Sequence, residues 1–444
     1  MRAVLAILGV GLLGCAPGEV TSAPPLDGTL DADTFDRATP PDDAAVAPTT
    51  DGGAADVARP DVVSMDTAPP PDAAPPPGRL GVVTRDGPGV TLRAHPTVNY
   101  RSVDAAWDAA RRTCLVVYGN GPVGGAFLDD DGAQVGDGFR LTDLPHPGGP
   151  WSQLPRAAAG RAGFVATWHI EVARSAMVQA RRVLPGGMFG GPAVAVSEPG
   201  TQQESPAAIA YAEEADEFLV VWAQSGLKGR RLDGSGTPVG PVLTLSTPDA
   251  WVEQPAVVWH PGARTYFVTY MQEHGGTRVN VQRVAVGTGA TVGAARSLSG
   301  DLAFAKVTDV AYDARAGEVI ATWFAVRGSA RSFEVERLRG DGEPVGPRAT
   351  VFAPHASYDG YDLAWSPATG TSFAAFHGTG AEAAGAELDA ENRDGAPFEV
   401  TAAAPRNGLF LPHVVAHPSR PWWLVMGSPD YGSVLVQRVA WRPR

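Results

Sequence analysis

The apolar and polar residues of this chain follow two patterns, and both are typical of β-strands. Continuous apolar runs such as 218–222 and 266–270 indicate strands that are buried on both faces. Alternating runs such as 281–284 and 436–439 indicate strands with one face toward water. Turns such as Asp341-Gly342 lie between such runs, and there glycine supplies the positive φ of a tight hairpin. No stretch after residue 78 keeps a 3.6-residue period, so the pattern predicts short antiparallel strands rather than helices.

An aromatic pair with a spacing of eleven residues recurs along the same part of the chain. The strong copies are Trp107/Tyr118, Tyr211/Trp222, Trp259/Tyr270, Tyr312/Trp323 and Trp365/Phe376, and the weaker copies are Ala157/Trp168 and Val415/Met426. The second members lie 50, 54, 48, 53, 53 and 50 residues apart. A period of this length indicates a solenoid, a propeller or another array of repeated units.

Each copy contains four strand-like runs, which is the content of one β-propeller blade. Seven copies predict an all-β, seven-bladed β-propeller over residues 79–444, and six blades with one stray copy is the alternative. The last copy ends at Arg444 after its third run, whereas residues 86–93 resemble the fourth run of the other copies. We therefore expect an N-terminal strand to complete the last blade and close the ring, which leaves few free strand edges.

The first fifteen residues have the form of an export signal. A single basic residue, Arg2, precedes an apolar stretch that is too short to span a bilayer, and Cys15 follows it. Leu12-Leu13-Gly14-Cys15 resembles the lipobox of bacterial lipoproteins. That resemblance implies a signal peptide over 1–15, cleavage before Cys15 and acylation of Cys15, for example with palmitate. Ala16 follows the cysteine, which in lipoproteins of diderm bacteria favours delivery to the outer membrane, with the ring on the periplasmic side or at the cell surface.

Residues 16–78 differ from the rest of the chain in composition. They contain thirteen prolines, and twelve acidic residues against two arginines give them a net charge of −10. Such a segment buries too little apolar surface to fold, so we predict a disordered, extended tether. Most of the total charge of −13 lies in this tether, and the near-neutral remainder argues against a nucleic-acid partner.

Several short motifs in the repeats are better explained by structure than by chemistry. Cys114 lies in an apolar run and is expected to be a buried hydrophobe, because a reactive thiol needs a polar setting. The glycines of 119–124 are followed by a strand and turn, whereas dinucleotide binding needs a helix there. Asp129-Asp130-Asp131-Gly132 lacks the remaining ligands of a calcium loop and fits a hairpin turn. The sequence thus predicts no cofactor, no metal site and no catalytic residue.

Three turn residues and one pair of histidines are also explained by structure rather than by chemistry. His260, Ser366 and His417 each precede a proline in the same turn, so we expect them to be structural. His413 and His417 are four residues apart on a predicted strand, which separates them by about 13 Å and excludes one shared zinc site.

Ligand recognition is predicted at the long loops that join the fourth strand of one blade to the first strand of the next. Their side chains combine aromatic rings with amides and charged groups, which suits stacking on sugars or a protein hot spot. The candidates are Trp151, Gln153, Gln203, Glu204, Trp251, Glu253, Gln254, His355, Tyr358, Asp359, Arg406 and Asn407. The alternative is that Trp151 and Trp251 fill gaps between blades and that the Gln and Glu residues cap strands.

The sequence leaves three hypotheses for function. The first is a membrane-tethered binding module of the cell envelope, whose partner is a glycan or a protein. The second is an exported hydrolase or lyase that acts in the funnel, with Glu204, Glu253 and Asp359 as acid and base. That chemistry requires carboxylates within roughly 5–10 Å of one another. The third is a structural component of an envelope complex.

Overall fold

The computed structural model describes residues 79–93, 102–142, 151–172, 175–200, 207–247, 251–273, 276–300, 304–328, 330–351, 361–377, 383–401, 410–428 and 433–444. All described residues belong to one of the two units into which the chain divides, the second unit, Ala68–Arg444. The predicted signal peptide, Cys15 and the predicted tether lie outside the described residues. In the part of the chain that is described, no helix is both long and apolar enough to cross a membrane.

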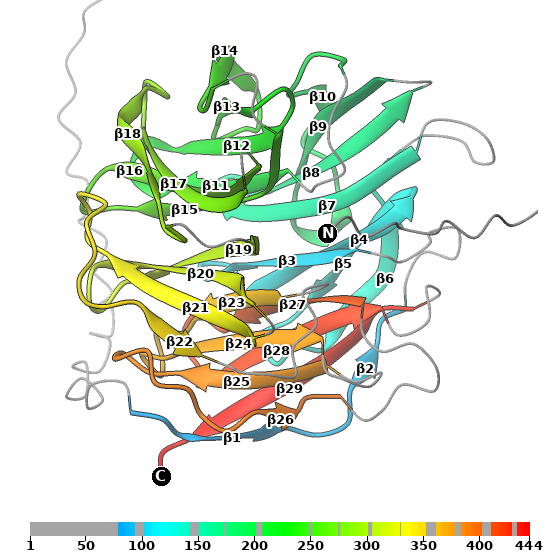
Figure 1. Ribbon diagram of the computed structural model, residues 1–444. Coiled ribbons are helices and arrows are strands. Elements are labelled where there is room, and N and C mark those ends of the chain that lie inside the picture. Colours follow the sequence, from blue (N-terminus) through cyan, green and yellow to red (C-terminus); the bar gives the residue numbers. More distant parts are fainter. Residues whose placement is uncertain are drawn as a thin grey trace, which may run out of the picture. The chain divides into compact units, whose positions relative to one another are not determined.

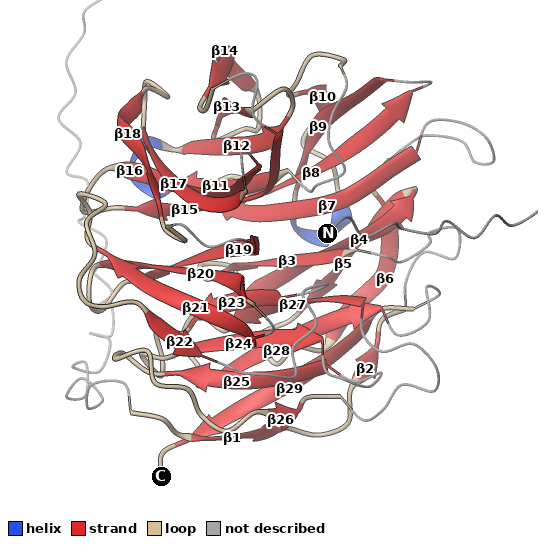
Figure 2. Ribbon diagram, viewed as in Figure 1, coloured by secondary structure: helices blue, strands red, loops and turns tan. Residues whose placement is uncertain are grey.

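The second unit is a seven-bladed β-propeller (Figures 1 and 2). The strands of each blade are antiparallel, and in blades 1 to 6 they follow one another in chain order. Blade 1 contains β3 (Val103–Asp108), β4 (Thr113–Gly121), β5 (Val123–Leu128) and β6 (Gln134–Arg140). Blade 2 contains β7 (Trp151–Gly160), β8 (Gly163–Val172), β9 (Ser175–Val183) and β10 (Val194–Ala195). Blade 3 contains β11 (Ala208–Ala212), β12 (Glu217–Ala223), β13 (Leu227–Asp233) and β14 (Pro238–Thr244).

The remaining blades follow the same order. Blade 4 contains β15 (Trp251–His260), β16 (Thr265–Glu273), β17 (Thr277–Ala285) and β18 (Thr291–Ser297). Blade 5 contains β19 (Phe304–Asp313), β20 (Glu318–Arg327), β21 (Ala330–Leu338) and β22 (Ala349–Val351). Blade 6 contains β23 (Tyr361–Trp365), β24 (Ser372–His377), β25 (Ala383–Leu388) and β26 (Phe398–Glu399). Blade 7 contains β27 (Phe410–Ala416), β28 (Trp422–Ser428) and β29 (Leu435–Arg442), with β1 (Val82–Arg85) and β2 (Val90–Thr91). The short 3-10 helices are η1 (Pro185–Gly187) and η2 (Glu213–Ala215).

The first strands of the blades form a closed ring. β3, β7, β11, β15, β19, β23 and β27 each contact the next first strand, and β27 contacts β3. Seven clusters of buried apolar residues match this arrangement, because each cluster lies between two neighbouring blades. The continuous apolar second strands supply most of these residues, since both of their faces are covered by neighbouring blades.

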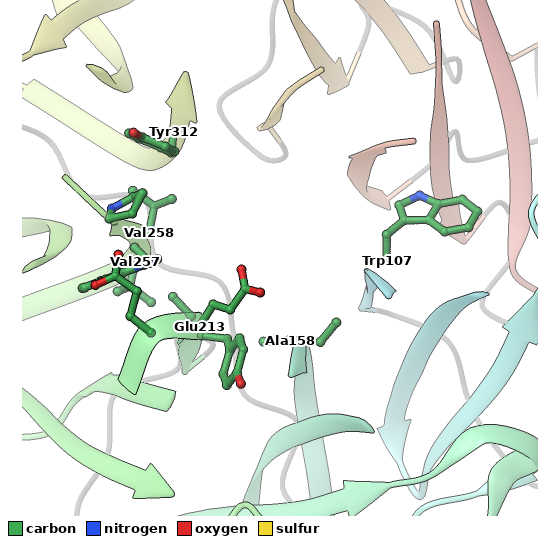
Figure 3. Close-up of a pocket in the computed structure, with 12 residues that line it drawn as sticks. Trp107, Ala158, Glu213, Val257, Val258 and Tyr312 are labelled. Carbon is green, nitrogen blue, oxygen red and sulfur yellow. The ribbon is translucent and has the colours of Figure 1, made fainter. Parts of the chain in front are cut away.

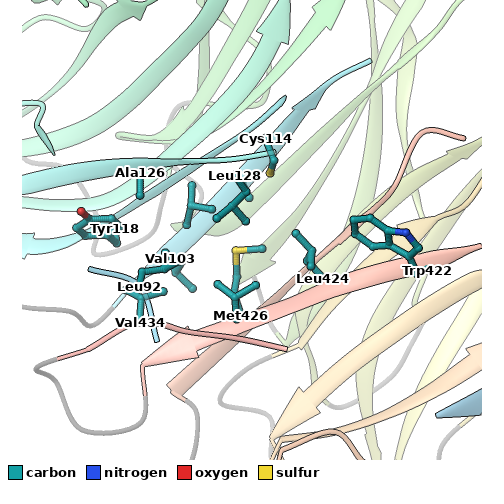
Figure 4. Packing of buried hydrophobic residues seen from close by; sticks show 13 residues of the cluster. Leu92, Val103, Cys114, Tyr118, Ala126, Leu128, Trp422, Leu424, Met426 and Val434 are labelled. Carbon is teal, nitrogen blue, oxygen red and sulfur yellow. The ribbon is translucent and has the colours of Figure 1, made fainter. Parts of the chain in front are cut away.

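The ring is closed by the N-terminal strands, as predicted. β1 pairs with β29 from Val82 opposite Arg442 onward, and β2 pairs Val90 with Val436. Figure 1 shows these blue strands beside the red β29. The closing segment begins earlier than the predicted 86–93, because pairing already starts at Val82. The core of this seam, which includes Leu92, is drawn in Figure 4.

The second member of the repeated pair is a large core side chain in each of blades 1 to 6. These side chains pack toward the preceding blade and are almost completely buried; they are Tyr118, Trp168, Trp222, Tyr270, Trp323 and Phe376. Cys114 is also fully buried, and desolvation raises the pKa of its thiol far above the usual value, so the expected inert role holds.

The structure corrects the two weak copies of the repeat. In blade 2 the turn between β7 and β8 is shorter, so that Ala159, paired with Phe164, stands where other blades have the first aromatic residue. In blade 7 that position belongs to Ala416, which pairs with Trp423. Neither position is aromatic. The repeat position lies two residues after Ala157 in blade 2 and one residue after Val415 in blade 7, and the spacing alone did not reveal these shifts.

A buried and an exposed tryptophan predict effects of different size on the free energy of unfolding. Trp222 is fully buried between blades, so Trp222→Ala should lower the free energy of unfolding by about 3–5 kcal/mol. Trp251 is 50% exposed, so Trp251→Ala should change it by less than about 1 kcal/mol. Urea denaturation of both variants checks this, and equal losses would contradict the placement of the two side chains.

Candidate functional site

A cavity of about 460 Å³ opens at the end of the ring where the first strand of each blade turns into the second. A volume of this size is in the range of small-ligand sites. The residues that line it come from blades 1 to 5, and Figure 3 shows them around an open centre. They are Trp107, Ala158, Ala159, Ala210, Tyr211, Glu213, Glu214, Val257, Val258, Trp259, Pro261 and Tyr312.

The four aromatic residues of this cavity occupy one repeated position. Trp107, Tyr211, Trp259 and Tyr312 are the first members of the aromatic pairs, and each is only partly buried. The strand opposite supports two of the rings directly: Tyr211 lies 4.6 Å from the Phe218 ring, and Trp259 lies 5.3 Å from the Tyr266 ring. In the sequence these residues indicated only the repeat, and their accessible faces were not predicted.

Small residues create the space between the aromatic rings. Blade 2 contributes Ala158 and Ala159 where blade 1 contributes Trp107, and blade 3 contributes Ala210 beside Tyr211. The cavity is therefore lined by small side chains at blade 2, where the repeat is weak. The break in the aromatic pattern at blade 2 is a signal that could have located it.

The polar groups of the cavity are acidic. The Glu213 side chain is exposed on η2, and its carboxylate projects toward the open centre (Figure 3). Glu214 is paired with Arg264 at 3.1 Å, and both side chains are largely exposed. The Tyr211 hydroxyl donates to Asp216 Oδ1 at 2.6 Å; burial and this acceptor raise the pKa of Tyr211 above its usual value.

The turns around the cavity are capped by side chains, as predicted for His260, Ser366 and His417. His260 Nδ1 accepts from Ala263 N at 3.1 Å, and His417 Nδ1 accepts from Arg420 N at 3.0 Å. Ser366 Oγ accepts from the main chain in the same way. All three side chains are buried, and their role is to fix the turns.

A second group of polar residues joins the blades along the inner strands. Asp104, Asp309 and Asp362 each lie three residues before the first aromatic residue of their blade. Each carboxylate accepts a main-chain N–H of the next blade at 2.6 Å, from Ala157, Leu363 and Val414 respectively. Because their oxygens are engaged by the neighbouring blade, these carboxylates are positioned to hold the ring together rather than to attack a substrate.

His413 occupies the equivalent position in blade 7 and lies between two of these carboxylates. Its Nδ1 is 2.7 Å from Asp362 Oδ2, and its Nε2 is 2.8 Å from Asp104 Oδ1. The Nε2 approach is an ion pair rather than an aligned hydrogen bond. Burial alone would lower the pKa of His413, but the two carboxylates outweigh it and raise the pKa well above the ordinary value. Sequence analysis considered His413 only as a metal ligand.

Burial and neighbouring charges also shift the pKa values of Asp104 and Asp309. Burial would raise the pKa of Asp104, but His413 and Arg156 hold it below the usual value. Burial and the adjacent Asp362 raise the pKa of Asp309 well above its usual value. These charged and polar residues form a row along the inner strands, with one member from each of blades 5, 6, 7, 1 and 2. The members, in that order, are Asp309, Asp362, His413, Asp104 and Arg156.

The sequence-predicted loop residues lie elsewhere. Trp251, Glu253 and Gln254 are described and lie together at the start of β15, the end opposite Trp259. Trp251 Nε1 donates to Glu253 Oε1 at 2.8 Å, and Gln254 has a left-handed φ of 49° at a break in the strand pairing. Trp151 and Gln153 begin β7 at the equivalent position, with backbone pairing to Glu171 and His169. Gln203, Glu204, His355, Tyr358, Asp359, Arg406 and Asn407 lie outside the described residues.

The proposed catalytic carboxylates receive no support from this geometry. Glu204 and Asp359 lie outside the described residues, and Glu253 is engaged by the Trp251 indole. Asp129 caps a hairpin by accepting from Asp131 N and Ala133 N, which agrees with the predicted turn. Within the described ranges, no group of three or more His, Cys, Asp or Glu side chains is arranged to hold a metal ion.

No protein-family model and no curated protein matches the chain. Solved structures do match it in fold. The BP39L lectin from Burkholderia pseudomallei is 13% identical with a TM-score of 0.58, over 77% of this chain and 96% of the lectin chain. A Kuenenia stuttgartiensis hydrazine synthase chain is 12% identical with a TM-score of 0.52, over 77% of this chain and 96% of that chain. At these identities the likeness shows the shared fold alone.

The His413 network predicts a pH-dependent stability. Because the pKa of His413 is raised above 6.5, its proton stabilises the folded state fully below about pH 6.5, and this contribution is lost as the pH rises through the raised pKa. Asp309 acts in the same direction, since its pKa is also raised. His413→Gln should lower the free energy of unfolding by about 3 kcal/mol near neutral pH, because two carboxylates lose their shared cation.

Urea denaturation of both proteins at a series of pH values above neutrality measures this linkage. The free energy of unfolding should fall less steeply with pH in His413→Gln, where only the Asp309 contribution remains. Parallel curves for the two proteins would show that His413 is not the protonated link between the blades.

Proposed function

We propose that this protein is a non-enzymatic glycan-binding module and that the cavity lined by Trp107, Tyr211, Trp259 and Tyr312 is its binding site. The single observation that carries the proposal is the set of partly exposed aromatic rings around one concave site. Aromatic rings stack on the apolar faces of sugar rings, and the Glu213 carboxylate supplies an acceptor for hydroxyl groups.

Two features support a rigid, preformed site. The rings stand on the inner strands of the propeller, which pack against one another around the whole ring. The turns beside them are fixed by buried caps such as His260. A site of this kind loses little conformational freedom on binding. The propeller fold is compatible with sugar recognition, since one of the structures that share it is a lectin.

We further propose that the ring is held at the cell envelope by a lipid on Cys15, with residues 16–78 as the tether, and that the anchor lies in the outer membrane. The lipobox-like residues Leu12 to Cys15 support this part of the proposal. Two or more acyl chains would hold the protein stably at a membrane.

The binding proposal predicts that Trp259→Ala lowers the affinity for the recognised glycan by about tenfold or more, because a central aromatic contact is removed. A glycan array identifies the ligand for the wild-type chain, and calorimetry measures the affinity of the variant. Circular dichroism melting confirms that the variant is folded.

The double variant Trp151→Ala/Trp251→Ala is the matched control for the other face of the ring. It should bind as the wild type does. If binding is lost in this double variant and kept in Trp259→Ala, the ligand lies at the loop face that includes Trp251. If no glycan binds, the function is not glycan recognition.

The anchoring proposal predicts that Cys15→Ser abolishes acylation. In a bacterial host fed a labelled fatty acid, the wild-type chain should carry the label and partition into detergent, and the variant should do neither. Label on both proteins would place the acyl group elsewhere, and label on neither would end the lipoprotein proposal.

A further inference from the structure

We infer that the cavity selects glycans with free amino groups, and that Glu213 is the counter-charge for the amine. This inference rests on the proposed glycan-binding function and adds the chemical class of the ligand. It concerns the charge of the cavity, which the aromatic rings alone do not determine.

The ionisable side chains that line the cavity are acidic. Glu213 and Glu214 are the only ionisable acids or bases besides tyrosine among the residues that line it. Aromatic faces are electronegative and attract cations within about 6 Å, so the rings act in the same direction as the carboxylates. An anionic sugar would be repelled, whereas an ammonium group would be attracted.

The two glutamates differ in whether their charge is already matched. Glu214 pairs with Arg264 at 3.1 Å. The Arg161 guanidinium donates to the Glu213 main-chain oxygen at 3.3 Å rather than to the carboxylate. In the described part of the chain, no ion pair engages the Glu213 carboxylate, which projects into the cavity (Figure 3).

An amino sugar combines the groups that this site can bind. Its ring offers an apolar face to Trp259 or Tyr312, and its protonated amine can reach a carboxylate at the edge of the same cavity. N-acetylation removes the charge and keeps the sugar ring, so it separates the contribution of Glu213 from that of stacking. Charged hydrogen bonds contribute more than neutral ones, which makes the difference measurable.

The test compares the glucosamine hexamer with the N-acetylglucosamine hexamer by calorimetry on the full chain. Both titrations use the same buffer, at about pH 6. We expect the glucosamine hexamer to bind about tenfold more tightly, and Glu213→Gln to remove this preference. Glu214→Gln is the matched control, because it makes the same change at a carboxylate already paired with Arg264, and it should keep most of the preference.

Equal affinity for the two hexamers, a preference for the acetylated hexamer, or equal effects of the two glutamate variants would overturn the inference. The proposed function would survive any of these results if a glycan still bound in a manner that depends on Trp259. It would survive in the same way if neither hexamer bound but another glycan from the array did. If the wild-type chain bound no glycan at all, both the inference and the proposed function would be wrong.

Discussion

The structure depends on the closure of the ring. Each blade has two apolar faces that only neighbouring blades can cover, so an open array would leave two faces exposed to water. Pairing of β1 and β2 with β29 joins the beginning of the described chain to its end and completes the last blade. The apolar cluster between blades 7 and 1 is then as well buried as the other six.

Charged groups reinforce the same seam between blades 7 and 1. Asp130 at the tip of blade 1 pairs with Arg112 of its own blade and with Arg420 and His417 of blade 7. The hydrogen bond from Arg112, together with His417 and Arg420, lowers the pKa of Asp130 to about 2 despite some desolvation. On the inner strands, His413 joins Asp362 of blade 6 to Asp104 of blade 1. Polar contacts at the seam therefore connect residues that are hundreds of positions apart in sequence.

The cavity is a consequence of the closed ring and of one repeated position. Closure brings together aromatic residues from blades 1, 3, 4 and 5 that are far apart in sequence, and it places them around one centre. The alanines of blade 2 leave part of that centre empty. The proposed binding site is thus built largely from repeat positions that also pack the blades, and Glu213 is added to it by a turn of blade 3.

The repeat period allowed the fold to be predicted, because buried positions such as Trp222 and Trp323 recur wherever a blade must cover its neighbour. The closing strand was predictable from the missing fourth strand of the last copy. The weak copies were misaligned, because Ala159 and Ala416 are not aromatic and so do not mark the repeat position in the sequence. The inner carboxylates were missed although Asp104, Asp309 and Asp362 share one repeat position. The cavity itself could not be predicted, because exposure of Trp259 depends on side chains from other blades.

The most direct test of this account is a crystal structure of the protein soaked with the glucosamine hexamer. The account predicts sugar density against Trp259 or Tyr312, with an amino group near the Glu213 carboxylate. Density at Trp251 on the opposite end of β15, with none in the cavity, would contradict it.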